Sequence, residues 1–208
     1  MKTEIYINAS SVIRNNAMYK NGQLVFEYTE PGIAGFLLSI YRHLQIDYPK
    51  FYKMDNLSKL GWLANELLLK NSFVKENYLP QETGVVFWNA NSSLDTDIKY
   101  FASTKEMASP ALFVYTLPNI VIGEICIRHQ FKGENSFFIS AEFDARFMKD
   151  YVSNLINNNI LQSCISGWVD VLGETGKAVL FLIEKKKVAH SLPFTTENII
   201  QIYQISNG

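Results

Sequence analysis

The sequence has little of several features that mark particular classes of protein. It holds two cysteines, Cys126 and Cys164, both in apolar stretches, and neither a disulfide framework nor a metal site can be built from them. The net charge of −1 argues against the basic face of a nucleic-acid-binding protein. No run approaches the ~20 apolar residues of a membrane span, and the N-terminus lacks the apolar core of a signal peptide. We therefore expect a cytoplasmic protein without nucleic-acid or membrane partners.

The composition supplies enough apolar material for a packed core. Hydrophobic residues make up 48% of the 208 residues and charged residues 19%, which is too apolar for a disordered chain. No proline- or glycine-rich linker, low-complexity tract or internal repeat interrupts the sequence. Residues 1–208 are therefore predicted to form a single domain.

Hydrophobic patterning predicts alternating strands and helices. The leucines after Asp55 recur at spacings of three and four, which is typical of a helix that Asp55 or Asn56 caps. The turn at 173–176 is too short for a phosphate-binding loop and predicts an antiparallel hairpin. The predicted strands are 5–13, 24–28, 84–90, 136–141, 161–171, 177–185 and 198–205, and the predicted helices are 31–48, 57–68, 118–128 and 143–156. This order predicts an α/β fold with a mixed, mostly parallel sheet covered by helices.

Four segments, in order over about residues 54–184, resemble motifs of the β-ketoacyl-[acyl-carrier-protein] synthase family. The segments are 54–60, the loop 91–97, the stretch 109–119 with Gly123, Glu124 and Gly133, and 167–170 with 173–178. The first of them, 54–60, is similar to the family's R-M-D-x-L-S-R-L helix start. The resemblance implies the N-terminal half of the thiolase-like fold, with the element order βαβαβαββ.

The sequence departs from this family at the position of the catalytic nucleophile. In the family, a strand leads into a tight elbow that ends in a reactive cysteine, whereas the matching strand here, 136–141, is followed by Glu142. A carboxylate near a helix N-terminus is stabilised as the anion and is a poor substitute for a thiolate. The family's two catalytic histidines lie in the second half of the fold, which this sequence is expected to lack. The resemblance therefore implies a protein without condensing activity.

The other reactive side chains are better explained as structural. The three histidines, His43, His129 and His190, match no family motif, and His129 is favoured where it stands, near a helix C-terminus. Cys164 lies inside an apolar run and is interpreted as a buried core residue. Ser140 and Ser166 lack a Gly-x-Ser-x-Gly elbow. We expect no cofactor and no metal ion.

The predicted helix 143–156 has one apolar and one polar side. Charged residues such as Arg146, Lys149 and Asp150 lie on the polar side, and burying them against a second sheet would be prohibitive. This pattern predicts that the second half of the fold is absent and that the polar side faces water or a polar partner. Glu142 then has a structural explanation, because together with Asp144 it places acids at a helix start. The alternative is a functional carboxylate.

The strand before the elbow is apolar, and in the family it pairs two subunits across a two-fold axis. Left open, such an edge favours pairing with another chain. The resemblance implies a homodimer, or a heterodimer with a synthase subunit, with acyl carrier protein as a further partner. The predicted interface residues are Ser136, Phe137, Phe138, Ile139, Ser140 and Ala141.

The sequence leaves three hypotheses for function. The first is a catalytically degenerate accessory subunit in fatty-acid or polyketide-type biosynthesis, polyene pigment synthesis included. The second is an enzyme that retains acyl- or malonyl-thioester chemistry through Glu142. The third is an unrelated α/β interaction module, which would lack a strand, elbow and helix over residues 136–156.

Overall fold

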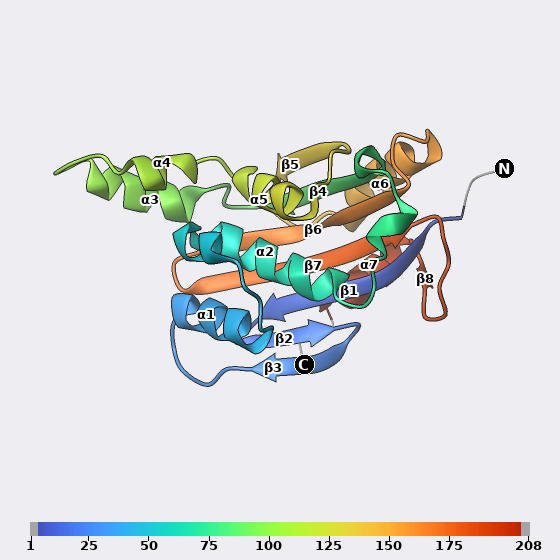
Figure 1. Ribbon diagram of the computed structural model, residues 1–208, viewed down its shortest axis with the longest axis horizontal. Coiled ribbons are helices and arrows are strands. Elements are labelled where there is room, and N and C mark those ends of the chain that lie inside the picture. Colours follow the sequence, from blue (N-terminus) through green and yellow to red (C-terminus); the bar gives the residue numbers. More distant parts are fainter. Residues whose placement is uncertain (1–3, 205–208) are drawn as a thin grey trace.

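The computed structural model describes residues 4–204, whose strands form one mixed sheet of eight strands (Figure 1). The order across the sheet is β3-β2-β1-β7-β6-β4-β5, and the short β8 pairs with β1. The strands are β1 (Tyr6–Arg14), β2 (Ala17–Lys20), β3 (Gln23–Glu27), β4 (Thr83–Asn89), β5 (Asn135–Ile139), β6 (Ser163–Leu172), β7 (Thr175–Glu184) and β8 (Leu192–Pro193).

Helices cover both faces of this sheet. They are α1 (Ile33–His43), α2 (Asn56–Leu69), α3 (Leu94–Ser103), α4 (Pro110–Val114), α5 (Ile120–His129), α6 (Ala145–Asn157) and α7 (Thr196–Gln204), with 3-10 turns η1 (Pro49–Lys53), η2 (Lys75–Asn77) and η3 (Pro80–Glu82). One apolar core lies under α1, α2 and α5, and a second lies under α6 and α7. The sheet is therefore the middle layer of three.

The predicted α/β class with a mixed sheet is confirmed. Strand β4 pairs in parallel with β5 and with β6, whereas β7 is antiparallel to its neighbours β6 and β1. Strands β1, β4, β5 and β6 thus share one direction, and β7 runs against them. The predicted hairpin at 173–176 joins β6 to β7.

Two of the strongest sequence signals describe the centre of the fold correctly. Every residue of β4 is buried, as its continuous apolar run predicted for a strand covered on both faces. Asp55 caps α2, because its carboxylate accepts a hydrogen bond from the Ser58 amide at 2.9 Å.

The prediction of a strand at 198–205 is wrong, because residues 196–204 form α7; residue 205 lies outside the described residues. The Thr195 hydroxyl accepts from the Asn198 amide at 3.3 Å and so supports the first turn. Ile199 and Ile202 are buried three residues apart, while Ile200 is 39% exposed. This spacing fits a helix packed on the sheet by one side.

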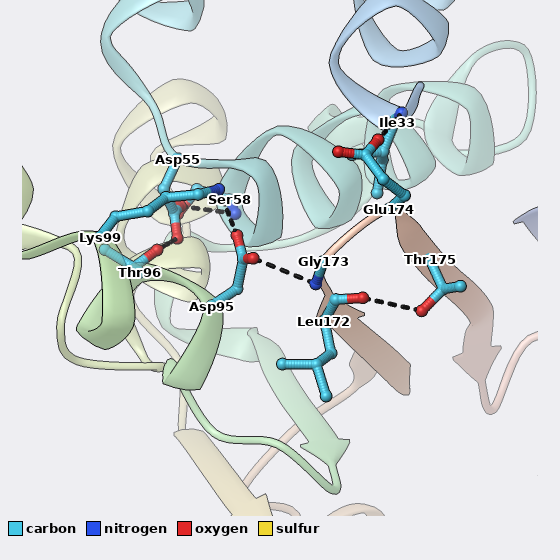
Figure 2. Close-up of polar contacts among 10 residues, drawn as sticks. All are labelled: Ile33, Asp55, Ser58, Asp95, Thr96, Lys99, Leu172, Gly173, Glu174 and Thr175. Carbon is cyan, nitrogen blue, oxygen red and sulfur yellow. Dashed lines mark hydrogen bonds and ion pairs between the residues drawn. The ribbon is translucent and has the colours of Figure 1, made fainter. Parts of the chain in front are cut away.

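Two acids, one from α3 and one from the turn itself, connect the β6–β7 hairpin to neighbouring helices (Figure 2). Asp95 of α3 accepts from the Gly173 amide at 3.1 Å and pairs with Lys99 at 2.6 Å. Glu174, in the turn itself, accepts from the Ile33 amide at 3.0 Å, at the start of α1. These contacts set the position of the turn relative to both helices.

Candidate functional site

The strand, elbow and helix predicted over residues 136–156 are present, as β5, a short turn and α6. The Ser140 amide donates to the Asn89 carbonyl at 2.9 Å, which extends the ladder with β4 by one bond. The Ser140 hydroxyl donates to the Glu142 carbonyl at 2.9 Å and tightens the turn. Asp144 then caps α6 by accepting from the Phe147 amide at 2.8 Å.

Glu142 lies on the surface of this elbow. Within residues 4–204, no hydrogen bond or ion pair of its carboxylate is found. We expected Glu142 and Asp144 to support the start of α6 together, but the capping hydrogen bond comes from Asp144 alone. No hydrogen bond or ion pair joins a histidine to Glu142 in the part of the chain that the structure describes.

The histidines lie on separate elements. His129 ends α5, where its Nε2 lies 2.6 Å from Glu66 Oε1, and its ring stacks on Phe131 with centroids 5.3 Å apart. His43 is exposed beside the Phe26 ring, and His190 is exposed in the loop before β8. His43 and His190 are thus surface residues and His129 lies at a helix C-terminus, as predicted.

Burial disfavours nucleophilic attack by either thiol and by the Ser166 hydroxyl. Cys164 is fully buried, and burial raises the pKa of its thiol above the usual value. Burial also raises the pKa of Cys126 to about 11, which keeps that thiol protonated at neutral pH. The Ser166 hydroxyl is buried in β6. Across residues 4–204, no group of three or more histidine, cysteine or acidic side chains could hold a metal ion.

The side of α6 that faces the sheet divides into two parts. Aliphatic residues such as Met148 and Val152 are buried in the core under α6 and α7. Phe147 and Tyr151 instead join Phe138 of β5 and Trp88 of β4 in an aromatic cluster, with Phe138 5.0 Å from Tyr151 and 5.1 Å from Trp88 between ring centroids. Phe147 is 42% exposed, so the cluster reaches the surface beside β5.

Strand β5 forms one edge of the sheet. The Val85 amide donates to the Glu134 carbonyl and the Ser140 amide to the Asn89 carbonyl. In a parallel pair the bonding residues alternate, so the backbone groups of 135, 137 and 139 point outward from the sheet. Ile139, on this edge, is 51% exposed.

A second apolar surface, which we call the α3–α4 arm, extends beyond the end of the sheet (Figure 1). Phe101 is 72% exposed, and Met107, in the connection between the helices, is 84% exposed. The other exposed apolar residues of the arm are Leu94, Ile98, Phe113, Val114 and Leu117. Sequence reasoning missed the arm, although Ile98 and Phe101 have the i, i+3 spacing of one helix face. Exposed apolar residues that lie together in this way are a feature of interaction surfaces.

No protein-family model matches the sequence, and no curated protein matches it. Solved structures do match the fold. The ishigamide ketosynthase/chain length factor superposes with a TM-score of 0.65 at 16% identity, over 91% of this chain and 64% of that one. A ketosynthase structure in complex with its chain length factor, from Xenorhabdus doucetiae, gives 0.57 at 11% identity, over 88% and 79%. A type II polyketide ketosynthase bound to its acyl-carrier protein gives 0.60 at 13%, over 88% and 63%.

The chain therefore has the thiolase-like fold of ketosynthases and chain length factors, as the sequence motifs predicted. The match spans 64% of the ishigamide protein's length. Among the residues that the structure describes, no helix is both long and apolar enough to cross a membrane.

Proposed function

We propose that the protein is a non-condensing partner subunit of a β-ketoacyl-synthase-type assembly in fatty-acid or polyketide-type biosynthesis. The observation that carries the proposal is Glu142, an exposed carboxylate at the elbow where the family has its reactive cysteine. A thioester exchange needs a thiolate or an equivalent nucleophile with a base beside it. The elbow offers neither, while its surroundings offer surface for a partner. Proteins with the same fold include a chain length factor that forms a complex with its ketosynthase.

The docking surface in this proposal is the outer edge of β5. Its outward backbone groups at 135, 137 and 139 can accept another strand, which is a common mode of chain association. The aromatic cluster beside this edge supplies large, partly exposed rings of the kind that dominate binding energy at interfaces. The α3–α4 arm adds further apolar surface, and acyl carrier protein is a further proposed partner.

If the partner is a second copy, charge selects one register. Antiparallel pairing centred on Phe137 places residues equally distant from it opposite each other, which brings Lys132 of one copy toward Glu142 of the other. Centring the pair on Phe138 instead brings Glu134 toward Glu142, and like charges opposite each other are destabilising. Only the register centred on Phe137 places each of the outward-facing residues 135, 137 and 139 opposite an outward-facing residue of the other copy. In this register Glu142 has a role in association.

A proline at position 139 tests whether the backbone edge is the docking surface. The Ile139 amide points outward, so Ile139→Pro leaves the bonds to β4 in place while it removes a donor from the free edge. The matched control, Ile139→Ala, shortens the same exposed side chain and keeps the amide. We expect Ile139→Pro to lose association in size-exclusion chromatography with light scattering, and Ile139→Ala to keep most of it.

The same variants identify the partner. Tagged protein purified from its native host should bring down a ketosynthase-type subunit with the native chain and with Ile139→Ala, and not with Ile139→Pro. A native chain that stays monomeric at high concentration and captures no synthase subunit or carrier protein would contradict the proposal. Capture that is equal for all three chains would contradict the role of β5.

A further inference from the structure

The loop of residues 185–191, which joins β7 to β8, begins with three consecutive lysines and contains no acid. We call it the lysine loop. It lies at the opposite end of β7 from the β6–β7 turn, beside β8 (Figure 1). The elbow lies at the turn end, because it follows β5, which runs parallel to β4 and, through it, to β6. A partner bound at the lysine loop therefore leaves the elbow free and is independent of the proposed function.

The positive charge of the lysine loop is not neutralised by an acid. Within residues 4–204, none of its three lysines forms an ion pair within 4.0 Å. Lys185 Nζ donates to Asn159 Oδ1 at 2.6 Å, and Lys187 Nζ lies 5.4 Å from the centre of the Tyr6 ring. Both of these partners are neutral, so the loop presents three positive charges to solvent.

Buried polar groups hold the lysine loop in one shape. The Asn8 side chain, in β1, is buried and donates to the Lys186 carbonyl at 2.8 Å and to the Glu184 carboxylate. The Ser191 hydroxyl donates to Asn8 Oδ1 and accepts from the Val188 amide at 2.7 Å. The three lysines are thus on a preformed loop, which loses little conformational freedom when it binds a partner.

Aliphatic side chains lie among these positive charges. Val188 and Leu192 are each 42% exposed. Ile160, next to the Asn159 that Lys185 contacts, is also exposed. Lysine beside exposed aliphatic groups is the combination that associates with the surface of an anionic membrane. A nucleic-acid site is typically rich in arginine and aromatic residues, and the lysine loop contains neither.

We propose that the lysine loop binds the surface of a membrane that contains anionic lipids. Its lysines would lie at the negatively charged head groups, with Val188 and Leu192 entering the boundary between head groups and acyl chains. The sequence led us to expect no membrane partner because it has no membrane-spanning run, but peripheral association needs none. With three lysines and two aliphatic side chains, the association is weak and reversible.

Flotation of the full chain with lipid vesicles in low-salt buffer tests the proposal. We expect binding to mixed phosphatidylserine and phosphatidylcholine vesicles, little binding to phosphatidylcholine alone, and a loss of binding as added salt screens the charges. The double variant Lys186→Gln with Lys187→Gln should weaken binding about 25-fold, since each lysine near an anionic surface contributes about fivefold. Both side chains are exposed, so the variant should fold, and thermal unfolding checks that it does.

The matched control is Lys53→Gln with Lys105→Gln, which removes the same charge from two exposed lysines outside the loop and should leave binding nearly unchanged. Val188→Ser keeps the charge and removes an exposed aliphatic group, so it should weaken binding severalfold. Equal weakening by the two double variants would show that only net charge matters and would overturn the assignment to this loop. Unchanged binding by Val188→Ser would contradict the entry of this side chain into the membrane.

An acidic protein or a nucleic acid is the other kind of partner that a positive loop could bind. Poly-glutamate and a single-stranded oligonucleotide are therefore titrated against the same chains. Binding to either polymer that the Lys186 and Lys187 double variant loses, without binding to the anionic vesicles, would overturn the proposal. Failure of the folded native chain to float with phosphatidylserine vesicles in low salt would overturn it as well.

Discussion

The register proposed for a second copy leads to a direct cross-linking prediction. The variant is Phe137→Cys in a Cys126→Ser background, which leaves Cys164 as the other thiol, fully buried in β6. Because Phe137 lies at the proposed two-fold centre, the two copies of residue 137 become a hydrogen-bonded antiparallel pair. The Cα atoms of such a pair are ~5.5 Å apart, within the range of ~4.4–6.8 Å that a disulfide spans.

The control is Ile139→Cys in the same background. In the proposed register, residue 139 lies opposite residue 135 of the partner, so the two copies of residue 139 are about four residues apart along the strands. That offset corresponds to ~14 Å, which is beyond the reach of a disulfide. On a non-reducing gel after mild oxidation, we expect a covalent dimer with cysteine at 137 and almost none at 139.

The neighbouring positions decide the result. Ser136→Cys and Phe138→Cys report pairing centred one residue to either side of Phe137. A covalent dimer that forms faster from either of these than from Phe137→Cys would refute the register and the proposed proximity of Lys132 and Glu142. Thermal unfolding of each variant shows whether the strand is intact, which is needed because Phe137 packs partly against the core.

Single side chains give three further predictions. Lys177→Met should raise the free energy of unfolding by about 1 kcal/mol near pH 7, once the half-exposed position is discounted. Burial lowers the folded-state pKa of Lys177 to about 8, below the unfolded value, so the native chain regains stability as pH rises toward 10.5. In urea unfolding in chloride buffer, the difference in unfolding free energy between the variant and the native chain should therefore shrink over that pH range. Asp55→Ala should cost about 1–2 kcal/mol in urea unfolding, because it removes the α2 cap and the acceptor of the Thr96 hydroxyl, while Asp55→Asn should keep most of the stability. Mass spectrometry of malonyl- and acyl-carrier protein should show the same result after incubation with the native chain and with Glu142→Gln. If the native chain converts these thioesters and Glu142→Gln does not, the thioester-enzyme alternative is established.

The elements that were predicted well are those with a clear local pattern of apolar and capping residues. Strand β4 is a continuous apolar run buried on both faces, and α2 combines a cap at Asp55 with a regular leucine stripe. The wrong strand at 198–205 had isoleucines at Ile199, Ile200 and Ile202, which suit a strand or a helix equally in so short a segment. Packing of one helix side on the sheet decides between the two.

Other features depend on contacts between distant segments and could not be predicted from local patterns. The position of Glu142 followed from the order of the motifs along the chain. The cross-strand alignment of Arg14, Asp170 and Lys177 depends instead on how β1, β7 and β6 pair, and these strands come from opposite ends of the sequence. The α3–α4 arm went unrecognised because its apolar residues face outward, whereas the helix signal assumes that such residues are buried.

The distribution of exposed side chains limits where a partner can bind. The face under α6 and α7 is covered by helices that carry exposed charges, Arg146 and Asp150 on α6 and Glu197 on α7. A partner seated there would have to desolvate these charges, which is costly unless each finds an opposite charge. At the β5 edge the outward groups are neutral backbone amides and carbonyls beside aromatic rings, and their hydrogen bonds are regained when a strand is added. These differences favour the proposed association at β5, next to the elbow that carries Glu142, over association on the face covered by α6 and α7.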